Sequence, residues 1–188
     1  MNRRTRGRLF VALALALLGA AAAVPGARAT VVGFDDLTGY APVPAGYAGL
    51  TWDPYWFCAD QAAWPGLAHS PSRFIFNRQT ADNLRSFDFP APVFFNGAWV
   101  AAYNMPYSTA SMRFVCYGGV AHNVWLGSSS WLPLGATPAY LATDIDGVTR
   151  VFAEYSNSGQ FLLDDLTYNA APVPVVGETW GGVKRLFR

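Results

Sequence analysis

The chain has 188 residues, of which 52% are hydrophobic, 15% aromatic and 13% charged, and its formal net charge is +1 at pH 7. Five of its 13 basic residues lie within the first 29 positions, so the other 159 residues carry 8 basic and 12 acidic side chains and a net charge of −4. Between Thr30 and Asn169 the arginines are few and well separated. This disfavours nucleic acid and anionic membranes as partners, because both require clustered Lys and Arg.

Residues 1–29 have the pattern of a secretory signal peptide. Four arginines within the first eight positions precede an unbroken apolar run from Leu9 to Val24. Ala27 and Ala29 then supply small residues at the two positions that a signal peptidase reads. A membrane anchor is the alternative, but the run is shorter than the roughly 20 residues that a spanning helix needs. We therefore expect cleavage after Ala29 and a secreted or cell-surface protein whose mature form does not span the membrane.

Short apolar or alternating segments follow one another at regular spacing, separated by Gly, Pro, Asn and Ser, and this pattern predicts about ten β-strands. An irregular aromatic segment at 53–72 must either pack over the strands or present a surface. Gly97 suggests a bulge, and Gly118-Gly119 suggests a two-residue hairpin. The expected strands cover residues 31–37, 50–52, 74–77, 86–90, 93–103, 111–117, 120–126, 131–134, 138–145, 148–155 and 161–168.

The absence of a convincing amphipathic pattern, together with abundant Gly and Pro, favours an all-β fold, an antiparallel β-sandwich. A jelly-roll strand order would place the first and last strands side by side. We expect one β-sandwich domain over residues 30–169. Residues 170–188 differ in composition and are interpreted as a linker and a short C-terminal tail with a weak helix at 180–187.

The two ends of this domain carry matching Asp-Asp-Leu steps, with Asp35-Asp36 in one and Asp164-Asp165 in the other. If the terminal strands meet, up to four carboxylates gather in one place, which calls for a cation or for protons. Side chains alternate along a strand, so only one Asp of each pair points to a given face. The alternative is that these are solvated carboxylates that protect an edge strand against aggregation.

Cys58 and Cys116 are the two cysteines. In an exported protein an even pair favours a disulfide bond. Two buried thiols in separate strands are the alternative, because Cys116 lies in the apolar run from Met112 to Tyr117.

Aromatic side chains are the candidates for a ligand-binding surface, since sugar sites combine flat rings with a few polar groups. Core packing is the alternative for each of them. The patterns place Trp52, Trp99 and Trp125 within strands and so favour the core for these three, although Trp99 is also a candidate for ligand binding. The expected binding residues are Trp56 and Trp64, from the irregular segment, with Tyr103 and Tyr107.

Three motifs give a resemblance to a known group of proteins: Phe34-Asp35-Asp36-Leu37, the segment Val43 to Trp52, and Phe161 to Tyr168. Over residues 30–169 the chain resembles secreted β-sandwich proteins, many of whose bacterial members carry a PEP-CTERM sorting signal. The resemblance implies a galactose-binding-like jelly roll that is non-catalytic and lies outside the cell or on its surface. It also implies a structural calcium ion between the terminal strands, for which Asp35, Asp36, Asp164 and Asp165 would supply oxygen ligands. The tail departs from the sorting signal because it has no apolar run of membrane length.

The sequence therefore predicts a secreted, non-catalytic β-sandwich that binds glycans or extracellular matrix or serves as a structural surface component. The alternative from another class is a secreted glycan-active hydrolase that uses two carboxylates. Catalysis has less support, because the two histidines and two cysteines have no zinc-site spacing and no Gly-x-Ser-x-Gly elbow is present.

Overall fold

The structure, a computed structural model, describes residues 28–78, 84–103, 111–156 and 160–170. These residues form antiparallel strands joined by loops, together with a single turn of 3-10 helix, η1 (Tyr47–Gly49). The expected fold class, an all-β antiparallel β-sandwich, is confirmed. The predicted signal segment up to residue 27, the residues beyond 170 and Tyr107 lie outside the described residues. No helix in the described ranges has the length and apolar character needed to cross a membrane.

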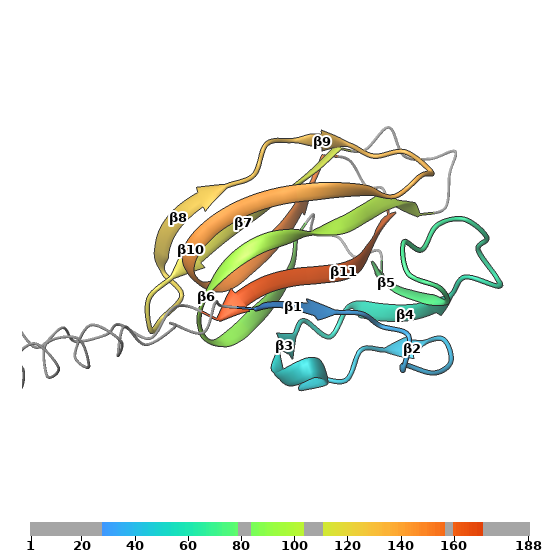
Figure 1. The fold of residues 1–188 in the computed structure, drawn as a ribbon, viewed down its shortest axis with the longest axis horizontal. Helices are drawn as coiled ribbons and strands as arrows, with labels where there is room; N and C mark the ends of the chain where they lie inside the picture. The colour runs from blue at the N-terminus through green and yellow to red at the C-terminus, as the bar shows by residue number, and fades with distance from the viewer. Residues whose placement is uncertain (1–27, 79–83, 104–110, 157–159, 171–188) are drawn as a thin grey trace, which may run out of the picture.

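Two long strands, β6 and β10, run through the middle of the fold (Figure 1). Their pairing is interrupted by register shifts, which let the hydrogen-bonded sheet bend over its own core. The strands are β1 (Ala29–Val32), β2 (Ala41–Pro42), β3 (Thr51–Trp52), β4 (Trp56–Asp60), β5 (Arg73–Asn77), β6 (Leu84–Tyr103), β7 (Ser111–Gly118), β8 (Val124–Ser128), β9 (Leu132–Pro133), β10 (Ala139–Tyr155) and β11 (Gln160–Ala170).

The strand order is β2-β4-β5-β11-β6-β10-β7-β8, with β1 on β11, β3 on β6 and β9 on β7. Every pair is antiparallel, as expected for strands joined mainly by loops. In Figure 1 the first strand, in blue, lies beside the last, in red. Val32 is the partner of Leu166 and Ala29 of Asn169, so the expectation that the chain ends meet is confirmed.

The main core is aromatic and lies inside the bent sheet. Phe34, Phe87, Phe95, Phe114 and Phe161 are fully buried or nearly so, and their rings pack mostly edge to face, which aromatic quadrupoles favour.

A smaller core lies on the outer face of β5, β11 and β6, beneath the irregular aromatic segment. Leu162 and Phe76 belong to this cluster, and Trp64 and Leu67 pack on it from above. Successive residues of a strand point to opposite faces. For this reason Phe161 and Leu163 enter the main core while Leu162 faces the covering loop. Residues 61–72 of the irregular segment therefore pack over the sandwich, whereas residues 56–60 form β4 within the sheet.

Gly97 marks an irregularity in β6, as the sequence predicted. Its φ is +139°, and the register shifts next to it on both the β10 and the β11 sides. A Cβ atom at this position would lie 2.1 Å from the carbonyl oxygen of Leu141, so only glycine fits.

The prediction of a two-residue hairpin at Gly118-Gly119 was wrong. β7 ends at Gly118 and β8 begins only at Val124, so five residues form the connection. The His122 N–H donates to the carbonyl oxygen of Gly119, and both residues have positive φ. This longer loop leaves the Val120 side chain fully exposed at its tip.

Candidate functional site

The outer face of β6, β10, β7 and β8 carries aromatic and charged side chains together. Along β10, Val151, Ala153 and Tyr155 point into the core, whereas Arg150, Phe152 and Glu154 are half-buried on the outer side. This alternation follows from the two-residue period of a strand. The outer face thus receives every second residue of this part of β10.

The register of β7 on β10 brings matching side chains side by side on this face. Tyr117 pairs with Arg150, Val115 with Phe152, and Arg113 with Glu154. The rings of Tyr117 and Phe152 meet edge to face, with centroids 5.6 Å apart.

A β-bulge in β8 adds a tryptophan to the face. Cys116 pairs with Gly127 and Tyr117 pairs with Trp125, so Leu126 is the extra residue between two regular pairs. Without this bulge Leu126 would stand opposite Tyr117. With it, Trp125 occupies that place and keeps 63% of its surface exposed.

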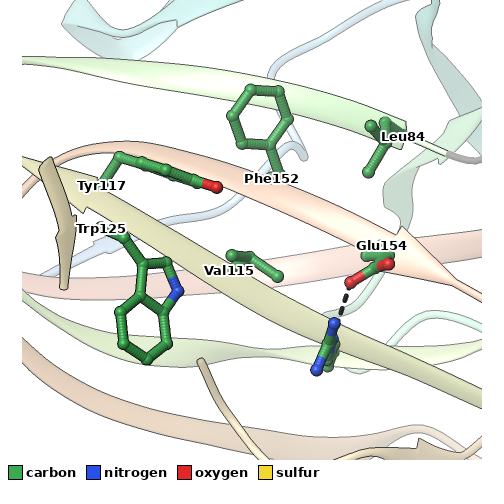
Figure 2. Close-up of a pocket in the computed structure, with 7 residues that line it drawn as sticks. Leu84, Val115, Tyr117, Trp125, Phe152 and Glu154 are labelled. Carbon is green, nitrogen blue, oxygen red and sulfur yellow. Dashed lines mark hydrogen bonds and ion pairs between the residues drawn. The ribbon is translucent and has the colours of Figure 1, made fainter. Parts of the chain in front are cut away.

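These side chains border a hollow of about 410 Å³ (Figure 2). Figure 2 shows Tyr117 and Trp125 at one end of the space and Glu154 at the other. Glu154 forms an ion pair with Arg113. The lining residues are Leu84, Arg113, Val115, Tyr117, Trp125, Phe152 and Glu154.

Four charged side chains in the described part of this face form two ion pairs. The Arg113 Nε atom lies 2.6 Å from Glu154 Oε2, and Arg150 binds both carboxylate oxygens of Asp88 at 2.6 Å each. The hydrogen bond to Asp88 raises the pKa of Arg150 above its usual value, so this side chain stays charged. Because each cation is matched by an anion, the face is electrically balanced while still presenting N–H donors and oxygen acceptors.

The two arginines also pack on rings. The guanidinium carbon of Arg113 lies 4.7 Å from the ring centroid of Trp131, and that of Arg150 lies 5.9 Å from Phe152. Such contacts fix the planes of the guanidinium groups. The combination of flat apolar rings with oriented donors and acceptors suits a ligand that has an apolar ring face and hydroxyl groups at its rim.

The aromatic residues expected to bind a ligand are placed elsewhere. Trp56 is completely buried at the start of β4, where its Nε1–H donates to the carbonyl oxygen of Ser86, so the expectation that it contacts a ligand was wrong. Tyr103 is 4% exposed and packs against Trp64, which itself lies over the smaller core. Trp56 therefore belongs to the main core, and Tyr103 and Trp64 belong to the packing of the loop on the sandwich.

Sequence reasoning missed the exposed tryptophan of β8. Trp125 was expected in the core because its segment alternates like a half-buried strand. Gly127 is the signal that marks the bulge, since an isolated glycine inside a strand pattern often accompanies one. The alternating runs from Arg113 to Tyr117 and from Arg150 to Glu154 also indicated a half-polar, half-aromatic face.

The acidic pairs gather around residues 69–73 of the loop that precedes β5. Asp164, fully buried, accepts hydrogen bonds from the N–H groups of His69 and Ser70 and from the Ser70 hydroxyl. Asp165 Oδ2 lies 2.7 Å from Nδ1 of His69. Asp35 accepts from the N–H groups of Ser72 and Arg73, so three of the four carboxylates tie this loop to the terminal segments.

Hydrogen bonding and burial shift the pKa values of two of these acids in opposite directions. Burial dominates at Asp164 and raises its pKa above 3.8, although the Ser70 N–H acts against this. At Asp35 desolvation is the largest single influence and raises the pKa. The hydrogen bonds from Ser72 and Arg73 together outweigh it, so the pKa of Asp35 falls below 3.8.

The arrangement of the four acids does not fit a calcium site. A calcium ion needs six to eight oxygen ligands with free lone pairs. Here Oδ1 of Asp35 and both oxygens of Asp164 face N–H and hydroxyl donors, and Asp36 accepts from the Tyr47 hydroxyl instead. Among the described residues no group of three or more His, Cys, Asp or Glu side chains could hold a metal ion.

Cys58 and Cys116 are both free, buried thiols. They lie in β4 and β7, which are separated in the strand order by β5, β11, β6 and β10. The expected disulfide is therefore not formed in this structure, and the alternative of two buried thiols in separate strands is the arrangement seen. Burial raises the pKa of Cys116 to about 12, which makes this thiol a poor nucleophile.

Comparison with known proteins finds likenesses only at the level of three-dimensional structure. No protein-family model matches the sequence. No curated protein matches it either. The K1 cleaved adhesin domain of Lys-gingipain from Porphyromonas gingivalis W83 has 13% identity and a TM-score of 0.49, over 76% of this chain and 98% of that one.

Two further solved structures are similar. The K2 cleaved adhesin domain of Lys-gingipain has 15% identity and a TM-score of 0.46, over 75% of this chain and 99% of that one. TmCBM61, solved in complex with beta-1,4-galactotriose, has 14% identity and a TM-score of 0.34, over 64% of this chain and 85% of that one. At these identities the likeness shows the fold, and a ligand does not transfer from one protein to the other.

Proposed function

We propose that this protein is a secreted, non-catalytic carbohydrate-binding β-sandwich, and that its glycan lies on the outer face of β7, β8 and β10. The observation that carries the proposal is the pairing of Trp125 with Tyr117 beside the Arg113–Glu154 ion pair. Rings supply the apolar surface for one face of a sugar, and the ion pair supplies donors and acceptors for its hydroxyl groups.

Trp125 is the residue on which binding depends most. It is 63% exposed, so a ligand finds it largely solvated and gains from covering it. Covering a large aromatic side chain is worth about 2 kcal/mol, which corresponds to roughly thirtyfold in affinity. Its removal leaves the core intact because its ring lies outside it.

The test is glycan-array screening followed by isothermal titration calorimetry of Trp125→Ala. We expect the variant to lose binding by roughly thirtyfold or more while its melting temperature stays close to that of the wild type. Tyr40→Ala is the matched control, because Tyr40 is 64% exposed but packs on Phe57 and Phe76, away from the face. Equal loss in both variants, or unchanged binding by Trp125→Ala, contradicts the proposal.

The same experiment separates binding from hydrolysis. A binding protein gives saturable heat without new reducing ends, whereas a glycan-active hydrolase releases reducing ends during incubation. In the hydrolase case, Asp88 and Glu154 are the carboxylates of this face, and each is engaged by an arginine. Release of product that depends on either of them would replace the binding proposal.

A further inference from the structure

The outer face contains a second hollow next to the first. It has a volume of about 490 Å³ and lies between the bend of β6 and the loop after β7. Asp88, Phe89 and Pro90 border it on one side, and Val120 and His122 on the other. Each hollow alone lies within the roughly 300–1,000 Å³ that small-molecule sites occupy.

The Asp88–Arg150 ion pair joins the two hollows. Asp88 lines the second hollow, and Arg150 holds both of its carboxylate oxygens. The guanidinium of Arg150 also lies over Phe152, which lines the first hollow. Arg150 therefore lies between a residue of the second hollow, Asp88, and a residue of the first, Phe152.

The register of five strands makes this path continuous. Thr51 pairs with Asp88, Asp88 with Arg150, Arg150 with Tyr117, and Tyr117 with Trp125. All five residues are exposed or half-exposed. With about 4.8 Å between neighbouring strands, the row is roughly 19 Å long, which is several times the width of one sugar ring.

We propose that the ligand of this face is an uncharged glycan chain that runs across the strands and occupies both hollows. This inference rests on the proposed carbohydrate-binding function and specifies its substrate class. The ligand is uncharged because the four charges of the row and of the first hollow cancel within the pairs Arg150–Asp88 and Arg113–Glu154. An acidic sugar would have to compete with a carboxylate already bound to each arginine.

The test compares chain lengths and charges by isothermal titration calorimetry. The probes are β-1,4-linked dimers and hexamers of glucose, xylose, mannose and galactose, with the hexamer of galacturonic acid as the charged counterpart. We expect at least one neutral hexamer to bind at least roughly tenfold more tightly than its dimer, because the second hollow adds contacts within one molecule. The charged hexamer should show no such gain.

Two matched variants assign the gain to the second hollow. Val120→Arg places a long side chain at its rim, and because Val120 is fully exposed the fold should not change. The advantage of the hexamer over the dimer should disappear. Val31→Arg, at a residue of β1 that is 57% exposed and outside both hollows, should keep it.

The outcomes separate this inference from the proposed function. If dimer and hexamer bind equally and both depend on Trp125, the face binds sugar but the two-hollow inference is overturned. A gain that survives Val120→Arg, or tighter binding of the galacturonic acid hexamer, overturns it as well. If no probe binds, the proposed function fails, and this inference fails with it.

Discussion

Single residues decide what the outer face offers to a ligand. Leu126 is the extra residue of the bulge, and because of it Trp125 rather than Leu126 lies opposite Tyr117. The exchange needs Gly127, whose φ of +151° other residues rarely adopt. Trp125 was expected in the core and is exposed, whereas Trp56 was expected to bind a ligand and is buried.

We predict that Asp35 contributes to the loss of stability at acidic pH. Its folded-state pKa lies below 3.8, so its ionised form stabilises the fold above that pH, and this stabilisation is lost as the pH falls through the lowered pKa. We expect Asp35→Asn to lose less stability on acidification than the wild type does. Urea unfolding midpoints across the acidic range measure this. Asp146→Asn, at an exposed residue with a hydrogen bond only to Gly147, should follow the wild type.

At the scale of elements, irregular points in the long strands shape the sandwich. The register shifts between β6 and β10 lie where the sheet bends, and Gly97 occupies the point at which β6 leaves its regular pairing. The sequence predicted this glycine's role. It did not predict the five-residue loop after β7, because Gly118-Gly119 has the composition of a tight turn. The hydroxyl of Thr149, which is distant in sequence, donates to the Gly119 carbonyl oxygen and lies within hydrogen-bond distance of His122 Nδ1 in the loop.

We expect Gly97→Ala to destabilise the protein by at least about 2 kcal/mol, because the new Cβ would clash with the Leu141 carbonyl and the backbone would be strained. Urea unfolding followed by tryptophan fluorescence gives the free energy of unfolding. The matched control is Gly46→Ala, since Gly46 has a φ of −105° and a methyl group added there would meet nothing within 4 Å. Similar losses in both variants would contradict the assigned role of Gly97.

At the scale of the whole molecule, the sequence predicted that the first and last strands meet. It did not predict which groups the acidic residues bind there. The matching acidic steps indicated correctly that β1 and β11 are neighbours. The sequence could not reveal that residues 69–73 would lie between the acids and provide N–H donors, because that contact depends on the path of a long irregular loop. The outer face escaped prediction for a similar reason, since the pairings of β6 with β10 and of β7 with β8 contain register shifts.

Asp164, the buried acid near the terminal strands, should contribute to stability through its hydrogen bonds as well as its charge. We expect Asp164→Ala to cost about 2–4 kcal/mol, because it leaves the N–H groups of His69 and Ser70 without their acceptor. Asp146→Ala, at an exposed position, should stay within about 0.5 kcal/mol of the wild type. The free energy of unfolding in urea is the measurement, and equal values for the two variants would show that the loop does not depend on Asp164.

We further expect calcium to leave the melting temperature unchanged, since N–H and hydroxyl groups already bind Oδ1 of Asp35 and both oxygens of Asp164. Differential scanning calorimetry in excess calcium and in excess chelator tests this expectation. A melting temperature that rises with calcium concentration would restore the ion implied by the resemblance to secreted β-sandwich proteins.

The pairing of β1 with β11 has a further consequence for how the protein folds. β1 is synthesised first and its partner β11 last, so the sandwich closes only after synthesis of the entire domain has finished. Closing so long a loop slows folding. The pair of terminal strands therefore forms late, and β1 stays without its partner strand until the last strand of the domain has been made.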